Sequence, residues 1–279
     1  MISHVVCHRY ERGYYKCVPD VKHIHLIICT AGAISISMNT TLLWFGDSYT
    51  VGQELGTLHG GFNTTEYDHS IPSLPIIDRQ RGRPDLAFPV LASKQLQLDF
   101  LLYGAGGRAI TGMYCDLLEF TKDKKHYVDY VAVFAFPAQV RRCHYIDNDG
   151  DYINHADSDV MRHQLRFHKF EATLNINSIH NTCVANNITP YYVSTWRQLE
   201  LIDDLNVVPD ENWLLPHDHT LVEHAWDFRD HTGDWLEVSD DNKWVFEKYI
   251  NPCMNHPNVL GQQLLASSMA RLLKGKLGV

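Results

Sequence analysis

The sequence predicts a layered α/β fold, in which helices pack against a central, mostly parallel sheet. Short, near-continuous apolar runs alternate along the chain with segments of helical periodicity. Such runs are typical of strands that are buried on both faces of a parallel sheet. The chain of 279 residues is 45% hydrophobic and 20% charged, which is ordinary globular composition. A single α/β domain of this length can bury a complete core.

Four segments are predicted as strands, and each leads towards a predicted helix. The first ends at Gly46, the second ends at a glycine cluster, the third is stopped by Pro137, and the fourth follows Pro190. The predicted strands span residues 41–45, 96–103, 127–136 and 191–196. Helices are predicted over 88–95, 110–120 and about 157–186, with a fourth at the C-terminal end.

Two of these helices have an apolar face. In the segment of about 157–186, this face consists of Val160, Phe167, Phe170 and Leu174. In the terminal helix, it consists of Leu260, Leu264, Leu265, Met269, Leu272 and Leu273. Two lysines follow at the C-terminal end of that helix, where the helix dipole favours cations.

The main domain is expected to span residues 38–279. Residues 1–37 are expected to form an N-terminal extension outside the main fold, because a second Met at position 38 begins a segment that leads into the first strand. The polar segments 141–159 and 197–257 are predicted as long loops. They are expected at the carboxyl edge of the sheet, where the loops of parallel strands gather.

Charge and hydropathy bear on partners and location. The net charge is −9, and the chain lacks the basic footprint expected for binding nucleic acid or an anionic membrane. No segment approaches the roughly 18 apolar residues of a spanning helix. The seven Cys are widely spaced without a C-x-x-C pair, which favours reduced thiols in a cytoplasmic protein. Basic residues ahead of the apolar stretch 24–38 resemble the start of a signal peptide, which leaves a secreted location open. A virion-associated location is left open as well.

Ser48 is the first candidate for chemistry. It lies in the segment 46–52 (Gly-Asp-Ser-Tyr-Thr-Val-Gly), directly after the first predicted strand. A serine on a tight strand-to-helix turn projects its hydroxyl into the crevice above the sheet, beside the positive N-terminus of the following helix. That geometry suits a nucleophile whose own N–H also stabilises an oxyanion. Gly, Asp and Ser are also common in ordinary turns, so this tripeptide alone does not identify a nucleophile.

The second signal is His256, which lies directly ahead of the terminal helix. Pro257 and a capping residue at Asn258 fix the start of that helix, which holds His256 in the loop before it. A neutral imidazole in this position can accept a proton from a serine hydroxyl.

Together the two motifs resemble the SGNH (GDSL-type) hydrolases, with G-D-S-x-x-x-G after the first strand and H-P-N-x-x-G at the terminal helix. The resemblance covers residues 38–275 and implies a three-layer α/β/α fold of flavodoxin-like type. It implies an esterase, lipase or deacetylase that needs no metal or organic cofactor. It also implies that Ser48 is the nucleophile, supported by Asp47, and that His256 is the base. The backbone N–H groups of Ser48 and Gly107 would then hold the oxyanion.

The chain departs from the family pattern at the acid. The family has an Asp three residues before the His, where this chain has Cys253. Three alternatives remain. The imidazole is oriented by a neighbouring acid (Asp240, Asp241 or Glu247), it is oriented by a backbone carbonyl, or the site is weakened. Loss of the orienting acid costs about four orders of magnitude in a full triad.

A second departure concerns the oxyanion hole. The family has a Gly-x-Asn-Asp block after the third strand, and its Asn position falls on Ala138 here. Gln139 or Arg141 is left to supply the third donor. The run of Pro-Ala-x-x-Arg after this strand resembles divergent members of the family from tailed bacteriophages.

Other patterns offer competing interpretations. Residues 104–109 also fit the G-x-G-x-x-A loop of dinucleotide-binding proteins, although they follow the second strand rather than the first. Residues 147–151 resemble the start of a calcium loop that lacks its Glu at position twelve. Zinc is a third alternative, although the spacing of its ligands within a loop is not diagnostic. Those ligands would be His217, Asp218, His219 and His224.

The sequence therefore predicts a serine esterase that acts on a small-molecule or glycan ester, such as a short-chain acyl ester or a sugar O-acetyl group. The alternative is a weakened or inactive protein of the same fold that binds carbohydrate or forms part of a larger assembly. Four tryptophans in the predicted loops either line an acyl or sugar pocket or pack the loops onto the sheet. They are Trp213, Trp226, Trp235 and Trp244.

Overall fold

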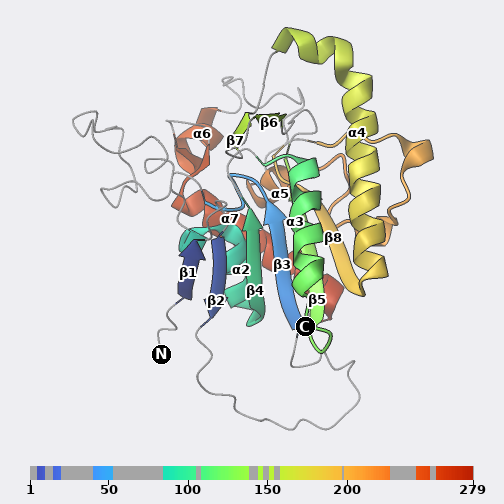
Figure 1. Cartoon of the computed structure of the whole chain (residues 1–279). Helices are drawn as coiled ribbons and strands as arrows, with labels where there is room; N and C mark the ends of the chain where they lie inside the picture. Colours follow the sequence, from blue (N-terminus) through green and yellow to red (C-terminus); the bar gives the residue numbers. More distant parts are fainter. Residues whose placement is uncertain are drawn as a thin grey trace.

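Four parallel strands form the central sheet of this computed structural model (Figure 1). They are β3 (Thr40–Gly46), β4 (Asp99–Gly104), β5 (Asp129–Phe136) and β8 (Ile188–Ser194). Their spatial order is β4-β3-β5-β8, and each neighbouring pair is parallel. The structure describes residues 5–9, 15–19, 40–52, 84–104, 108–137, 144–146, 151–153, 158–196, 198–226, 243–251 and 256–278.

Helices cover both faces of this sheet (Figure 1). On one face lie α2 (Phe88–Leu96) and α7 (Val259–Leu277), and on the other lie α3 (Ile110–Asp123) and α4 (Ser158–Ala185). The predicted three-layer α/β/α fold is therefore confirmed. All four predicted strands and all four predicted helices are present, with bounds shifted by a few residues.

The two faces of β3 explain why its sequence is continuously apolar. Leu42 and Trp44 belong to the core on the α2–α7 side, whereas Leu43 and Phe45 belong to the core on the α3–α4 side. All four side chains are fully buried. A strand that is covered on both faces has no solvent-facing positions for polar residues.

Several short elements complete the described chain. The hairpin of β1 (Val5–Arg9) and β2 (Tyr15–Pro19) lies within the predicted extension, with β2 beside β4 (Figure 1). The segments predicted as loops contain short helices and strands, which are too short for hydrophobic periodicity to reveal. They are β6 (His144–Ile146), β7 (Asp151–Ile153), η2 (Asp203–Leu205), η3 (Asp210–Asn212), α5 (Leu221–Trp226), α6 (Lys243–Tyr249), β9 (Ile250–Asn251) and β10 (His256–Pro257), and η1 (Pro84–Leu86) precedes α2.

The apolar face predicted for α4 is not the face that the helix buries, where the structure describes it. Phe170 and Leu174 are 41% and 45% exposed. The helix instead buries a second stripe at the same helical spacing, namely Ala172, Ile176, Ile179 and Cys183. The helix has two apolar stripes with the same helical period, and the sequence pattern alone does not show which of them packs against the sheet. Leu260, which was placed in the buried stripe of α7, is 43% exposed.

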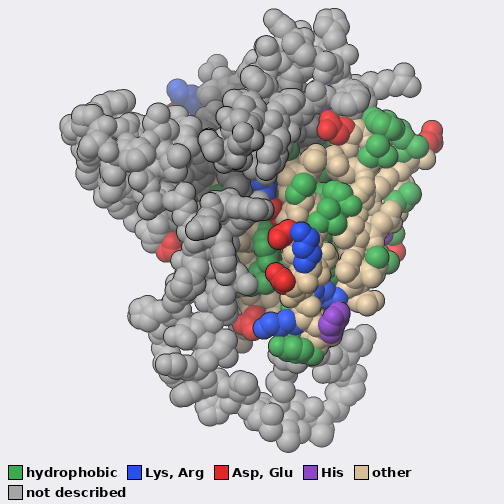
Figure 2. All heavy atoms as spheres, viewed as in Figure 1, with side chains coloured by type: hydrophobic (Ala, Val, Ile, Leu, Met, Phe, Trp, Pro, Cys, Tyr) green, Lys and Arg blue, Asp and Glu red, His purple; other side chains and the backbone are tan. Residues whose placement is uncertain are grey.

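The outer surface over α3 and α4 mixes apolar and charged side chains (Figure 2). The charged residues include the exposed pair of Lys122 and Glu119, whose Nζ and Oε2 lie 2.7 Å apart. Single apolar side chains, such as Leu118 and Tyr127, lie among them, as is normal for a protein surface. Among the described residues, no helix combines the length and the apolar character that a membrane crossing requires.

Candidate active site

Ser48 lies on the turn that follows β3, at a special position in the sheet. The chain runs from β3 to β4 on one side of it and then to β5 on its other side. The strand order therefore reverses next to β3. Open α/β sheets bind their ligands at such a switch point, outside the carboxyl ends of the strands. Ser48 is two residues beyond the carboxyl end of β3.

The turn is held by Asp47, whose side chain is fully buried. Its Oδ1 accepts a hydrogen bond from the Tyr49 N–H at 3.0 Å, and its Oδ2 accepts one from Trp196 Nε1 at 3.4 Å. Its backbone oxygen accepts from the Val51 N–H at 3.1 Å. The supporting role that the family resemblance implies for Asp47 has a physical form here, since its carboxylate fixes the peptide that follows Ser48.

The hydroxyl of Ser48 is buried without a hydrogen bond to any described residue. Leaving a buried hydroxyl unpaired costs about 1–3 kcal/mol. A native structure retains such a group where it has a function or where another group completes it. The Thr50 hydroxyl of the same turn is also buried and unpaired, so it is the position of Ser48 at the switch point that makes its unpaired oxygen a candidate nucleophile.

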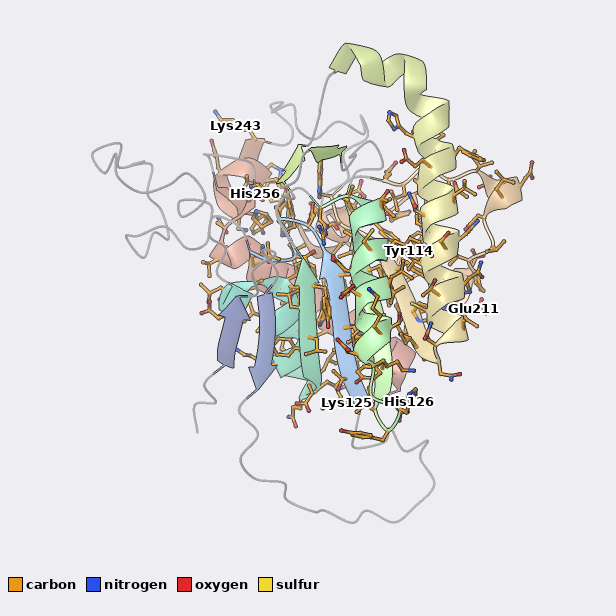
Figure 3. The ribbon with its side chains drawn as sticks, viewed as in Figure 1. Tyr114, Lys125, His126, Glu211, Lys243 and His256 are labelled. Atoms are coloured by element: carbon orange, nitrogen blue, oxygen red, sulfur yellow. The ribbon has the colours of Figure 1, made fainter. Side chains whose placement is uncertain are left out.

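His256 lies against the same turn. Its ring centroid is 5.4 Å from that of Tyr49, with the ring planes tilted by 47°. Tyr49 in turn stacks on Trp196, with 5.9 Å between centroids. The structure thus brings the two sequence motifs together, although they come from opposite parts of the chain. Figure 3 shows His256 at the carboxyl edge of the sheet, far from Lys125 and His126 at the opposite edge.

The position of His256 is fixed by the elements on either side of it. In β10 it pairs with Asn251 of β9. Two residues later Asn258 caps α7, with its Oδ1 accepting from the Gly261 N–H at 2.9 Å and its Nδ2 donating to the Lys248 oxygen at 2.9 Å. An N-cap of this type is worth about 1 kcal/mol. The cap predicted from the sequence is present.

Most of the other predicted site residues lie outside the described residues, namely Gly107, Gln139 and Arg141 of the proposed oxyanion hole and the candidate acids Asp240 and Asp241. The third candidate acid, Glu247, is described. Its side chain on α6 is 66% exposed, and its Oε1 lies 3.8 Å from Lys243 Nζ. The positions of the two departures, Cys253 and Ala138, lie outside as well. The roles assigned to these residues stay predictions.

The competing sites are partly described. No group of three or more His, Cys, Asp or Glu that could hold a metal ion occurs among the described residues, which include the four candidate zinc ligands. Most of the calcium-like loop lies outside the described chain, as do residues 105–107 at the centre of the dinucleotide-like loop. Trp213 and Trp226 are buried and pack the connecting segments onto the sheet, whereas Trp244 is 43% exposed.

Two residues at the site were missed by the sequence analysis. Trp196 donates to Asp47 and stacks on Tyr49, and Gln262 donates from Nε2 to the backbone oxygen of Tyr49 at 3.1 Å. Gln262 had a signal in the sequence. It is a polar residue in line with Leu265, Met269 and Leu273 of the buried stripe of α7.

Comparisons with known proteins give solved structures that this chain resembles. A carbohydrate esterase family 2 enzyme with a carbohydrate-binding domain, from Corynascus thermopiles (Myceliophthora fergusii), is 12% identical, with a TM-score of 0.48 over 90% of this chain and 69% of that one. A member of the lipolytic protein G-D-S-L family from Veillonella parvula DSM 2008 is 12% identical, with a TM-score of 0.39 over 83% and 97%. An acetyl xylan esterase (Est2A) from the rumen bacterium Butyrivibrio proteoclasticus is 13% identical, with a TM-score of 0.43 over 88% and 66%. No protein-family model and no curated protein matches the sequence.

The names of these structures agree with the expected resemblance to SGNH (GDSL-type) hydrolases. With identities of 12–13% and TM-scores of 0.39–0.48, they assign no chemistry to this chain. The chemistry has to be argued from the residues of this chain. The narrower resemblance to members from tailed bacteriophages stays a prediction.

Proposed function

We propose that the protein is a serine ester hydrolase that forms an acyl-enzyme on Ser48 with His256 as the general base. One observation carries the proposal, namely the buried Ser48 hydroxyl that has no hydrogen-bond partner among the described residues. It lies at the switch point of the sheet, where ligands bind. The ring of His256 packs against the adjacent Tyr49.

In the proposed reaction, Ser48 Oγ attacks the acyl carbonyl carbon while the imidazole of His256 takes the hydroxyl proton. The N–H groups of Ser48 and Gly107 hold the oxyanion of the tetrahedral intermediate. When the intermediate collapses, the bond to the alcohol oxygen breaks and the imidazolium returns the proton to the alcohol. Water then attacks the acyl-enzyme with the same base, which releases the acid and restores Ser48.

The proposed substrate is a neutral ester, either a short-chain acyl ester or an O-acetyl group on a sugar. A net charge of −9 favours a neutral substrate over an anionic one. Trp244 offers a half-exposed aromatic surface on α6, and β9, which follows α6, pairs with His256. An exposed aromatic ring on the helix that leads into β9 is a suitable platform for the apolar face of a sugar.

The test compares wild type with Ser48→Ala, using a nitrophenyl acetate and a fluorophosphonate probe. Wild type is expected to hydrolyse the ester and to take one covalent label, whereas Ser48→Ala loses the label and at least about 10³-fold in kcat, as removal of a nucleophile does. The matched control is Ser93→Ala. Ser93 is also fully buried, but it bonds Trp44 and the Pro89 oxygen rather than the turn, so this variant should keep both label and turnover.

A wild type that is inert to both reagents would contradict the proposal. That outcome would favour the second candidate function, a non-catalytic protein of this fold that binds carbohydrate or forms part of an assembly. The observation that favours it is the pair of departures at Cys253 and Ala138, where the family has its acid and an oxyanion donor. Binding of acetylated xylan oligosaccharides by the inert protein would then identify it.

A further inference from the structure

Gln262 is a fully buried amide in the first turns of α7. It belongs to the stripe that faces the sheet, together with Leu265, Met269 and Leu273. Glutamine is mostly exposed in proteins, because burying an amide without hydrogen bonds is costly. An apolar residue here would be the simpler way to build the core. The amide therefore needs an explanation from its partners.

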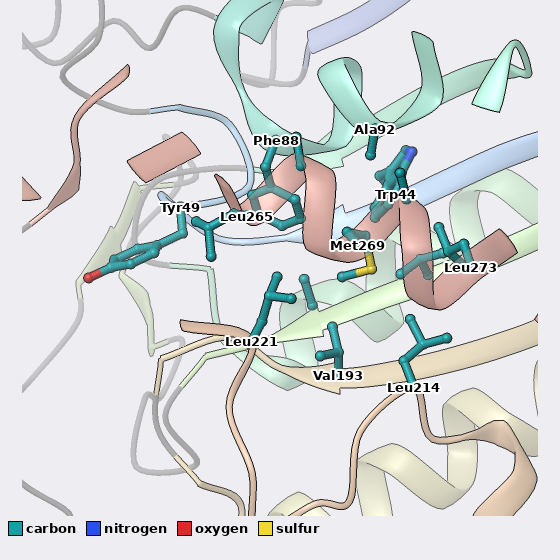
Figure 4. Close-up of a cluster of buried hydrophobic side chains, with 14 of the residues drawn as sticks. Trp44, Tyr49, Phe88, Ala92, Val193, Leu214, Leu221, Leu265, Met269 and Leu273 are labelled. Carbon is teal, nitrogen blue, oxygen red and sulfur yellow. The ribbon is translucent and has the colours of Figure 1, made fainter. Parts of the chain in front are cut away.

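Both ends of this amide are paired with backbone groups from distant parts of the chain. Nε2 donates to the Tyr49 oxygen at 3.1 Å, and Oε1 accepts from the Phe88 N–H at 2.8 Å. A carbonyl needs a donor and an N–H needs an acceptor, so the two partners fix the orientation of the amide. Figure 4 shows Tyr49 and Phe88 on either side of Leu265 at the start of α7.

The contact with Phe88 has an ordinary structural role. Phe88 is the first residue of α2, and the preceding Ala87 makes no side-chain cap. The first N–H groups of a helix have no partner within the helix. The Oε1 of Gln262 satisfies one of them from across the core. This contact alone would explain a stabilising residue.

The contact with Tyr49 has a different consequence, because Tyr49 directly follows Ser48. The Tyr49 N–H donates to Asp47 Oδ1. Its oxygen accepts from Gln262 Nε2 at 3.1 Å and, at 3.4 Å, from the Gly52 N–H of the same turn. Its ring is held between Trp196 and His256. The residue next to the proposed nucleophile is thus fixed at its N–H, its carbonyl and its ring.

The helix that carries Gln262 also fixes His256. Asn258 caps α7 two residues after His256, and its oxygen accepts from the Gln262 N–H at 2.9 Å. The side chain of Gln262 therefore joins the segment that holds the base to the turn that holds the nucleophile. Catalysis depends on such geometry, since a misplacement of about 1 Å costs about 10²-fold in rate.

We infer that Gln262 is a positioning residue for the ester hydrolysis, which holds the Ser48 turn in register with His256 through the carbonyl of Tyr49. This inference rests on the proposed function of Ser48 and His256. Gln262 does not touch the reacting atoms. It acts through the peptide that follows the nucleophile.

The first test is Gln262→Met, which keeps the length and apolar volume of the side chain and removes both hydrogen bonds. We expect kcat for nitrophenyl acetate to fall by about 10- to 100-fold, while KM changes less than threefold. The rate of fluorophosphonate labelling at Ser48 should fall by the same factor as kcat. A kcat within threefold of wild type overturns the inference, whatever happens to the stability of the fold.

The second test is Gln262→Glu, which separates the two contacts. A carboxylate still accepts from the Phe88 N–H but repels the Tyr49 oxygen, whereas the protonated acid can donate to it. Burial raises the pKa of such an acid. The ratio of the Gln262→Glu rate to the wild-type rate should therefore rise by at least threefold between pH 8 and pH 5.5. If Gln262→Met fails to fold, the inference is tested by this ratio alone. A ratio that is the same at pH 8 and pH 5.5 overturns the inference.

Ser93→Ala is the matched control for a lost buried hydrogen bond in the same core. It leaves Trp44 Nε1 without its acceptor, far from the turn. It should lower the thermal unfolding midpoint as Gln262→Met does, with kcat within twofold of wild type. An active wild type with an unaffected Gln262→Met overturns this inference alone. An inert wild type overturns both this inference and the proposed function.

Discussion

Gly46 is required by space rather than by backbone conformation. An ideal Cβ at this position would lie 1.8 Å from Thr50 Oγ1 and 2.4 Å from Thr50 Cβ. Thr50 is fully buried and cannot swing out into solvent. The positive backbone φ in this turn belongs to Gly52 instead. The first glycine of the motif thus lets the chain fold back tightly enough to place Ser48.

Gly46→Ala is expected to lower the free energy of unfolding by about 1–3 kcal/mol, as overpacking of a core does. The loss should be smaller in the double variant Gly46→Ala/Thr50→Gly than the sum of the two single losses, because Thr50→Gly removes all three clashing atoms. Urea unfolding of the four proteins measures this coupling.

The control for this prediction is Gly275→Ala, on the exposed side of α7. A Cβ there meets nothing within 4 Å, and replacing a helical glycine by alanine gains about 0.5–1 kcal/mol. Additive losses at Gly46 and Thr50 would show that steric contact is not the reason for the glycine.

Among the secondary-structure elements, α3 begins with a buried ion pair. Arg108 Nε donates to Asp116 Oδ2 at 2.9 Å, and Arg108 Nη2 pairs with Asp116 Oδ1. Both side chains are only 3% exposed. Gly112 lies between them on the helix, and a Cβ there would be 2.7 Å from Arg108 Cδ. The pair anchors the start of α3 directly after Gly107, the proposed oxyanion donor.

Asp116→Ala is expected to cost about 3–5 kcal/mol, because it leaves a buried guanidinium without its carboxylate. The double variant Arg108→Met/Asp116→Leu should cost less than Asp116→Ala, since an apolar pair of similar volume carries no charge to desolvate. Denaturant unfolding checks both values. The opposite order would mean that the pair itself contributes more than its desolvation penalty.

The same elements show what the sequence could predict. Strands such as β3 and β5 were recognised because burial on both faces leaves a continuous apolar run. The buried face of α4 was not recognised from the sequence, because the helix has two apolar stripes with the same period. The link between α2 and α7 through Gln262 joins residues 174 apart. A local pattern carries no information on such a contact.

On the scale of the whole molecule, the motifs predicted two candidate site residues but not how they are held. Ser48 and His256 were identified because each lies beside a turn or a helix start with recognisable chemistry. Their approach depends on the strand order and on Tyr49 and Trp196, which meet only in the folded chain. Two of the three candidate acids, Asp240 and Asp241, lie outside the described residues, so the identity of the acid stays a prediction.

The histidines make the stability of the whole protein depend on pH. Burial lowers the pKa of both His180 and His224 from 6.5, and the nearby charges of Arg271 and His219 lower that of His224 further. The unfolded chain therefore takes up these protons first as the pH falls. The contribution of the two residues is fully present above pH 6.5 and is lost as the pH falls through their folded pKa values.

We expect the free energy of unfolding to fall between pH 7.5 and pH 5.5, and to fall less in the double variant His180→Gln/His224→Gln. Urea unfolding at constant ionic strength, in steps of half a pH unit, measures both slopes. His126→Gln is the control, since it replaces a histidine at the far edge of the sheet (Figure 3). If the free energy of unfolding depends on pH equally in wild type and the double variant, His180 and His224 are not the cause of the dependence.

The hydrogen bond between Gln262 and Tyr49 joins residues 213 apart in the chain, and this separation has a consequence for biosynthesis. At about 5–20 residues per second, a ribosome takes roughly 10–40 s to make the intervening chain. During that time the emerging turn lacks the amide of Gln262 and the ring of His256, which packs against Tyr49. The Gly52 N–H, which also donates to the Tyr49 oxygen, is already there. The proposed reactivity of Ser48 is therefore expected to appear only after the last helix has docked.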